Sequence, residues 1–83
     1  MSVPTFFVLE VPENDGVVEV ASADVANTVD RVGPYVRISA AREIVIDRRA
    51  TGVRHAVWYS AVAGLQDAVV TQHDKDALRV GPR

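Results

Sequence analysis

The densest group of side chains that could do chemistry lies in the middle of the chain, within eight consecutive residues. The run reads Arg48-Arg49-Ala50-Thr51-Gly52-Val53-Arg54-His55 and holds three guanidinium groups and one imidazole. Guanidinium forks match the oxygens of carboxylates and phosphates. We therefore expect Arg48, Arg49, Arg54 and His55 to form a surface that takes an acidic protein or an anionic ligand.

Two large aromatic residues, Trp58 and Tyr59, follow this cluster closely in the sequence. An exposed aromatic ring can stack on a base or a ligand, and both residue types are also enriched where protein interfaces are buried. We include both in the predicted binding surface. The alternative is a structural cluster, in which Glu43, Asp47 or the acidic residues of the first thirty positions neutralise the arginines.

The two histidines allow other chemistry, but their spacing supports none of it. A metal site would have to combine His73, Asp74 and Asp76, with or without His55, and this matches neither a His-Glu-x-x-His motif nor an EF-hand. A serine nucleophile at Ser60 would lie on the opposite strand face from His55. The glycines lie singly, without phosphate-loop spacing. We predict no catalytic residue, no metal and no cofactor.

Charge changes sign along the chain. Residues 1–30 contain six acidic residues and no lysine or arginine, whereas residues 31–58 contain six arginines and two acidic residues. The formal net charge of −2 does not indicate a protein that binds nucleic acid, because such proteins usually carry a net positive charge. Either strands of opposite charge pair within one sheet, or the molecule presents a bipolar surface for binding.

Apolar periodicity predicts the elements that position these residues. Residues 5–11 and 17–21 are expected to form a hairpin, because aromatic and β-branched runs flank the turn signal Asp15-Gly16. One helix is expected over residues 22–32, where Val25, Ala26, Val29 and Val32 recur at helical spacing. Gly33 should adopt a positive φ after the end of that helix.

Five further strands are expected over residues 35–39, 43–49, 53–63, 68–72 and 77–80, the last at a sheet edge. The arginine run would then occupy a hairpin tip, with Trp58 and Tyr59 on opposite strand faces. The fold class is α+β, with the order β-β-α-β-β-β-β. We expect a strongly curled antiparallel sheet or small barrel of about six strands with one helix. The whole chain, 1–83, is expected to be a single domain.

Length and composition limit how such a domain is stabilised. The chain has 83 residues, 48% of them hydrophobic, and no cysteine. Domains this small commonly need disulfides, a metal or self-association, so we predict a homo-oligomer, most simply a dimer, with Trp58 or Tyr59 buried at its interface. The amino terminus resembles neither a signal peptide nor a membrane span, and we expect a cytoplasmic protein without membrane contact.

These observations favour a small non-enzymatic interaction or accessory module that forms a homo-oligomer and docks on another protein. The first alternative is a binder of anionic ligands or nucleic acid that uses the segment from Arg48 to His55, although the net charge does not support nucleic acid. The second is a small enzyme with an interface site at His55 or His73.

Overall fold

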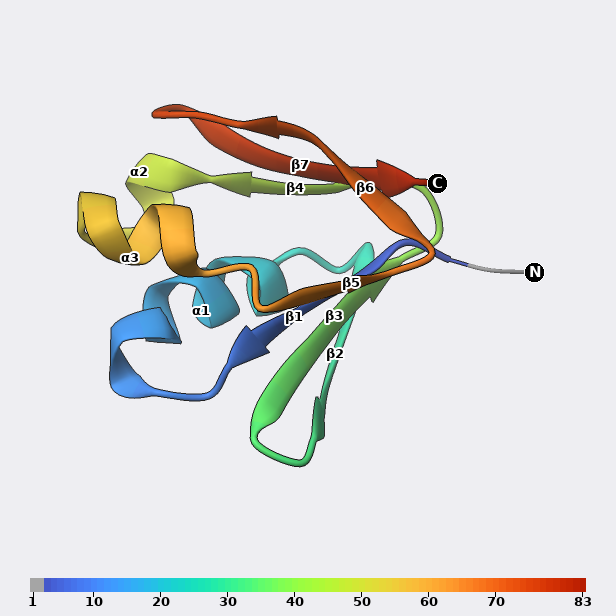
Figure 1. Ribbon diagram of the computed structural model, residues 1–83, viewed down its shortest axis with the longest axis horizontal. Helices are drawn as coiled ribbons and strands as arrows, with labels where there is room; N and C mark the ends of the chain where they lie inside the picture. The colour runs from blue at the N-terminus through green and yellow to red at the C-terminus, as the bar shows by residue number, and fades with distance from the viewer. Residues whose placement is uncertain (1–2) are drawn as a thin grey trace.

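The computed structural model describes residues 3–83 and has the expected α+β class, with antiparallel sheets and short helices (Figure 1). The elements follow one another as β1 (Thr5–Leu9), η1 (Pro12–Asn14), α1 (Asp15–Ala23), β2 (Asn27–Val32), β3 (Tyr35–Ala40), β4 (Ile44–Asp47), α2 (Arg48–Thr51), α3 (His55–Ser60), β5 (Gly64–Gln66), β6 (Ala68–His73) and β7 (Ala77–Pro82). None of the helices within residues 3–83 has the length and apolar character needed to cross a membrane.

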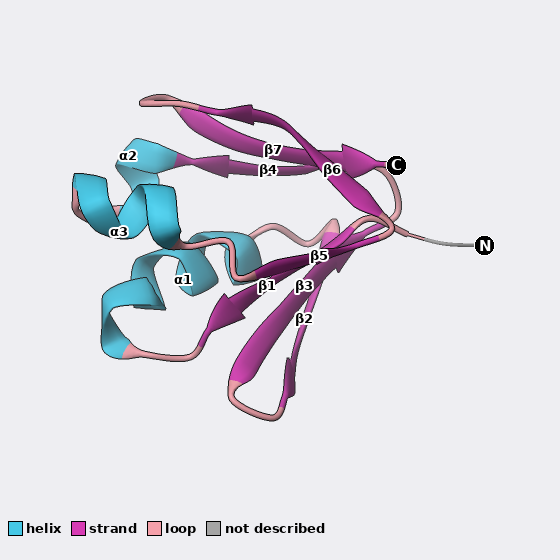
Figure 2. Ribbon diagram, viewed as in Figure 1, coloured by secondary structure: helices cyan, strands magenta, loops and turns pink. Residues whose placement is uncertain are grey.

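The strands form two separate sheets rather than the single strongly curled sheet or barrel that we expected. One sheet has the order β2-β3-β1-β5 and the other β4-β7-β6. Figure 2 shows the sheets diverging from the side where the carboxyl terminus lies, with α1, α2 and α3 packed between them at the open end. α2 and α3 lie between β4 and β5 in the chain, and β5 pairs with β1 of the first sheet.

Both sheets and the helices contribute to one hydrophobic core. The first sheet supplies Phe6, Val8, Val36 and Ile38, and the second supplies Ile44, Ile46, Leu78 and Val80. Trp58 is fully buried and is the largest side chain of the core. Each sheet therefore buries one face, as the period-2 alternation of β1, β3 and β4 requires.

The expected hairpin over residues 5–21 was wrong in its second half. Residues 15–23 form α1, whose Val17 and Ala21 are buried one helical turn apart. Pro12 opens η1 directly before this helix, at a position where proline is well tolerated. The valines suggested a strand, but burial of a helical stripe against β4 and α2 outweighs their modest strand preference.

The helix expected over residues 22–32 was also wrong. α1 ends at Ala23, a turn follows in which Ala26 N–H donates to Asp24 Oδ1 at 2.9 Å, and β2 begins at Asn27. Val25, expected in the core, is fully exposed. Gly33 does have a positive φ of 57°, but it forms the two-residue turn between β2 and β3 instead of ending a helix.

The longest expected strand, residues 53–63, contains α3 instead, and residues 48–51 form the single turn α2. The arginine run is therefore not a hairpin tip. The expected single helix is thus replaced by α1, α2, α3 and the turn η1. Strands expected over residues 35–39 and 68–72 are confirmed as β3 and β6, and the strand expected over 43–49 is confirmed only over Ile44–Asp47 as β4. The last strand, β7, lies in the centre of its sheet and not at an edge.

Candidate functional site

The predicted binding residues lie at the helical end of the molecule, on α2, on α3 and on the link between them. Asp47 caps α2, because its Oδ2 accepts the backbone N–H of Ala50 at 3.0 Å. Gly52, with a φ of 67°, ends the turn in the left-handed conformation. Arg48 and Arg49 thus project from a tightly defined single turn.

No carboxylate of residues 3–83 forms an ion pair with Arg48, Arg49 or Arg54. The ion pairs of the described chain are Arg31 with Glu10, Arg37 with Asp30, Lys75 with Asp76, and Arg79 with Glu43. Among the acidic residues that could have made the cluster structural, Glu43 binds Arg79 and Asp47 caps α2, whereas Glu13 lines the same depression as Arg54 without forming an ion pair. The three arginines therefore have no ion pair within residues 3–83, and Arg49 and Arg54 are exposed.

Arg48 differs from the other two arginines because it is half-buried. Its backbone N–H donates to the carbonyl of Asp76 at 3.0 Å, which ties α2 to the turn between β6 and β7. Its Nε is buried and has no hydrogen-bond partner among the described residues. Arg48 therefore combines a packing role with its charge, and substitutions that test charge alone belong at Arg49 and Arg54.

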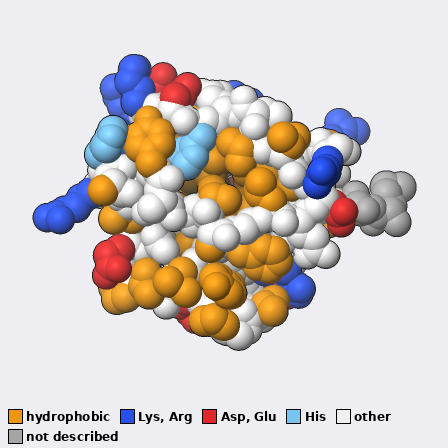
Figure 3. All heavy atoms as spheres, viewed as in Figure 1, with side chains coloured by type: hydrophobic (Ala, Val, Ile, Leu, Met, Phe, Trp, Pro, Cys, Tyr) orange, Lys and Arg blue, Asp and Glu red, His pale blue; other side chains and the backbone are white. Residues whose placement is uncertain are grey.

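A row of aromatic rings lies beside the arginines. Tyr59 contacts His55 edge to face at 4.8 Å between ring centroids and His73 at 5.1 Å. Figure 3 shows a hydrophobic side chain between the two pale blue histidines on this face of the molecule. The sequence did not associate His73 with this surface, because His55 lies on α3 and His73 on β6. The i, i+4 spacing of His55 and Tyr59 would have predicted the contact between these two rings if residues 55–60 had been recognised as a helix.

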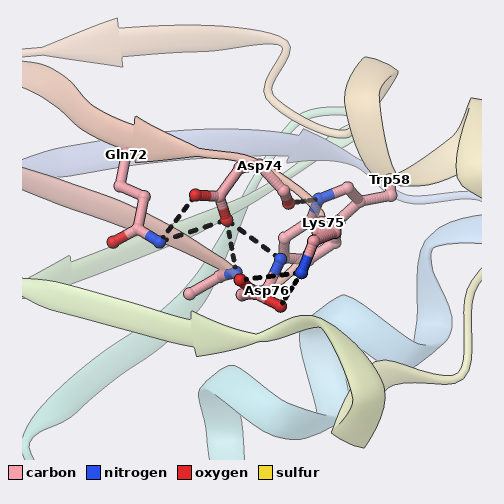
Figure 4. A network of polar contacts seen from close by, with 6 residues as sticks. Trp58, Gln72, Asp74, Lys75 and Asp76 are labelled. Carbon is pink, nitrogen blue, oxygen red and sulfur yellow. Dashed lines mark hydrogen bonds and ion pairs between the residues drawn. The ribbon is translucent and has the colours of Figure 1, made fainter.

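Trp58, predicted as a binding residue, cannot contact a partner because it is fully buried. Its indole Nε1–H donates to the carbonyl of Asp74 at 2.6 Å, shown in Figure 4. In return His73 Nε2 donates to the carbonyl of Trp58 at 3.0 Å; that nitrogen must carry a proton because a carbonyl only accepts. These two bonds fasten α3 to the turn between β6 and β7, so Trp58 positions Tyr59.

The turn itself is held by Asp74. Its carboxylate accepts the backbone N–H groups of Asp76 and Ala77 and the side-chain amide of Gln72 (Figure 4). The bond from the Asp76 N–H, followed by those from Gln72 and Ala77, lowers the pKa of Asp74 below its usual range. The segment considered as a metal site therefore uses its first carboxylate to order the turn, and residues 3–83 contain no cluster of three potential ligands.

Within residues 3–83, the hydroxyl of Ser60 bonds to backbone carbonyls of its own helix and not to a histidine. Its hydroxyl donates to the carbonyl of Ala56 at 2.9 Å within α3, as serine does in helix interiors. The described residues of the site present guanidinium groups, one phenol ring and two imidazoles at the surface. Such a surface is suited to binding an acidic partner through charge and aromatic contact.

Comparison with known proteins adds information on the fold. No protein family matches the chain, and no curated protein matches it. Among solved structures, a chain of the structure of a phenol hydroxylase–regulatory protein complex is similar, with a TM-score of 0.78 and 13% sequence identity. The likeness covers 99% of this chain and 100% of that one. At this identity it establishes a shared fold.

Proposed function

We propose that this chain is a single-domain, non-catalytic regulatory or accessory module that docks on a larger enzyme in the cytoplasm. The observation that carries the proposal is the fold shared with a chain of the phenol hydroxylase–regulatory protein complex, over the full length of both chains. We take that chain to be the regulatory protein, because its full length corresponds to no more than 83 residues here.

Docking is proposed to use the arginine surface, which we define as Arg48, Arg49, Arg54, His55 and Tyr59. The support is electrostatic, since no carboxylate of residues 3–83 pairs with the three arginines. Tyr59 is 41% exposed beside them and supplies apolar contact area. A partner with acidic residues would neutralise the guanidinium groups and cover the ring.

Self-association is a separate part of the proposal. The small core and the exposed apolar side chains of residues 3–83 favour a homodimer, and of the two aromatic residues predicted at its interface only Tyr59 is accessible. Sedimentation equilibrium at micromolar concentration tests this, and a strictly monomeric mass would contradict it.

Binding of nucleic acid or a small anion is the second candidate, favoured by the same uncompensated arginines. It predicts that the purified protein carries material absorbing at 260 nm, and that its affinity for single-stranded DNA falls steeply with salt. A 260/280 nm absorbance ratio typical of protein alone, together with the absence of DNA binding at low salt, would eliminate nucleic acid.

The docking proposal is tested with a tagged full-length chain and the enzyme that copurifies with it from its own cells. We expect the isolated chain to show no turnover, and its stoichiometric addition to change the kcat/KM of the purified enzyme. Replacement of Arg49 and Arg54 by Ala should weaken docking at least tenfold while leaving Tm nearly unchanged, because both side chains are exposed and outside the described ion pairs.

A matched control replaces Arg42 and Arg83 by Ala, which removes the same charge from two other exposed positions. Equal loss of docking in the control and the test variant would show that net charge, and not the arginine surface, governs binding. An enzyme whose rate is insensitive to the added chain would refute a regulatory role.

A further inference from the structure

Three open depressions of about 320, 320 and 390 Å³ adjoin one another between the first sheet and the helices, and we call them together the groove. Tyr35 and Ala63 line both the first and the second depression, and Glu13 and Val57 line both the second and the third. The groove therefore runs from the outer face of β1 and β3, past α3, to the link between α2 and α3.

The groove is apolar where it crosses the sheet. Phe7 and Leu9 project from β1 on the face opposite the buried Phe6 and Val8, and Leu9 is 41% exposed. Tyr35 lies opposite Leu9 on β3, 38% exposed, with its ring 6.5 Å from that of Phe7. Figure 3 shows hydrophobic side chains gathered over the lower part of this face, below the histidines.

Charged walls flank the other end of the groove. Glu13 on η1 and Arg54 before α3 line the same depression, and neither belongs to an ion pair within residues 3–83. An occupant of this end meets one carboxylate and one guanidinium group. Complementarity requires an acidic group toward Arg54 and a basic group toward Glu13.

We propose that the groove binds an amphipathic helix of the enzyme partner, whose apolar side chains lie on Phe7, Leu9 and Tyr35 and whose acidic end reaches Arg54. The inference rests on the proposed docking function and names the chemistry of the docked segment. A helix suits the groove because η1, α3 and the start of α1 line its second and third depressions. The two strands that contribute to this lining, β1 and β3, are each paired on both sides and cannot pair with an extended segment. The backbone of a helix needs no such partner, since its hydrogen bonds are internal.

The test uses two designed helical peptides and the full-length, ¹⁵N-labelled protein. Both peptides carry leucine at every third or fourth position; one ends with a glutamate placed to reach Arg54 and a lysine placed to reach Glu13, and the other has these two charges exchanged. We expect the first peptide to shift the amide resonances of Phe7, Leu9, Tyr35, Val57 and Ala63 and to bind at least tenfold more tightly than the charge-exchanged peptide. Absence of binding at millimolar peptide, or shifts confined to the second sheet, would overturn the proposal.

Two variants with similar exposure separate the groove from general surface hydrophobicity. Leu9→Glu introduces a charge at a 41% exposed position in the groove, and Val69→Glu introduces the same charge at a 45% exposed position on β6. Peptide affinity should fall at least tenfold for the first variant only. An equal effect of both substitutions would refute the groove.

The same two variants distinguish this inference from the docking proposal itself. If Leu9→Glu binds the purified enzyme as tightly as the unaltered chain does, the groove inference fails while docking stands. If the unaltered chain fails to bind any enzyme, the docking proposal fails, whatever the peptides do. Concentration-dependent shifts of the groove residues without peptide would identify a second copy of this chain as the occupant and overturn the assignment to a partner helix.

Discussion

Gly16 is the position at which one methyl group should do the most damage to the fold. It lies at the start of α1, where a Cβ atom would stand 2.0 Å from the carbonyl oxygen of Thr51 and 2.9 Å from its carbonyl carbon. Favourable C···O contacts fall at about 3.3–3.6 Å, so α1 and α2 would have to separate by more than about 1 Å. Val53 Cγ1, 3.1 Å from the same Cβ position, restricts movement further.

Gly16→Ala is expected to lower the free energy of unfolding, whereas replacing a glycine within a helix by alanine usually raises it. Gly→Ala within a helix normally stabilises by about 0.5–1 kcal/mol, because alanine loses less backbone entropy on folding. Forcing an extra methyl group into a packed contact costs about 1–3 kcal/mol. The upper part of that range applies here because Thr51 is buried and its hydroxyl donates to Arg48 O at 2.6 Å. The net loss for Gly16→Ala is therefore about 2 kcal/mol.

A thermal melt followed by far-ultraviolet circular dichroism measures this loss. For a domain of this length, about 2 kcal/mol corresponds to a decrease in Tm of roughly 8–16 °C. Gly81→Ala is the matched control, because its Cβ would meet Thr71 Cγ2 at an ordinary 3.7 Å and should leave Tm almost unchanged. A Gly16→Ala protein that melts at or above the unaltered protein would refute the close approach of α1 to α2.

Four further outcomes are expected. Trp58→Phe should lower the free energy of unfolding by about 2 kcal/mol, measured by urea denaturation, because it leaves the Asp74 carbonyl without its indole donor; a loss below about 0.5 kcal/mol would contradict this bond. Asp74→Asn should reduce the loss of unfolding free energy that the protein shows as pH falls. The pKa of Asp74 is lower in the folded than in the unfolded chain, so its carboxylate contributes stability that is fully present above the unfolded pKa of about 3.9 and is lost as pH falls through the folded pKa. Unchanged acid titration in calorimetry would exclude that contribution. Gly33→Ala should cost about 1 kcal/mol because φ is positive there, and Gly33→Asn should cost less; equal melting temperatures would be inconsistent with the turn. Asp47→Ala should cost about 1 kcal/mol through loss of the α2 cap, and a stability equal to that of the unaltered chain would show that the cap contributes nothing.

The site was only partly predictable from the sequence. The concentration of arginines was visible, and the structure leaves these arginines without an ion pair within residues 3–83. The sequence also proposed Trp58 and Tyr59 together, but consecutive residues of α3 point in directions about 100° apart. One is fully buried and the other 41% exposed. Which of the two faces the core depends on where α3 packs.

The sequence by itself determined the α+β class, several strands and the positive φ of Gly33. The alternation of apolar and polar residues in β3 predicts a strand with one buried face, because side chains of a strand alternate between its two faces. The aromatic and β-branched run of β1 predicts a strand through residue type. The positive φ at Gly33 was predicted for a residue that ends a helix, and it occurs instead in the turn between β2 and β3. These features depend on residues near one another in the chain.

Only the tertiary structure decided whether the valine-rich segments were helix or strand. Residues 17–21 fit both periods, and α1 forms because Val17 and Ala21 can be buried together beneath the second sheet and α2. Residues 27–32 pair with β3, which no local preference encodes. The close approach at Gly16 and the meeting of His73 with Tyr59 likewise join residues 35 and 14 positions apart. Short apolar runs carry little helix or strand preference of their own, so the burial that the whole chain makes available selects between them.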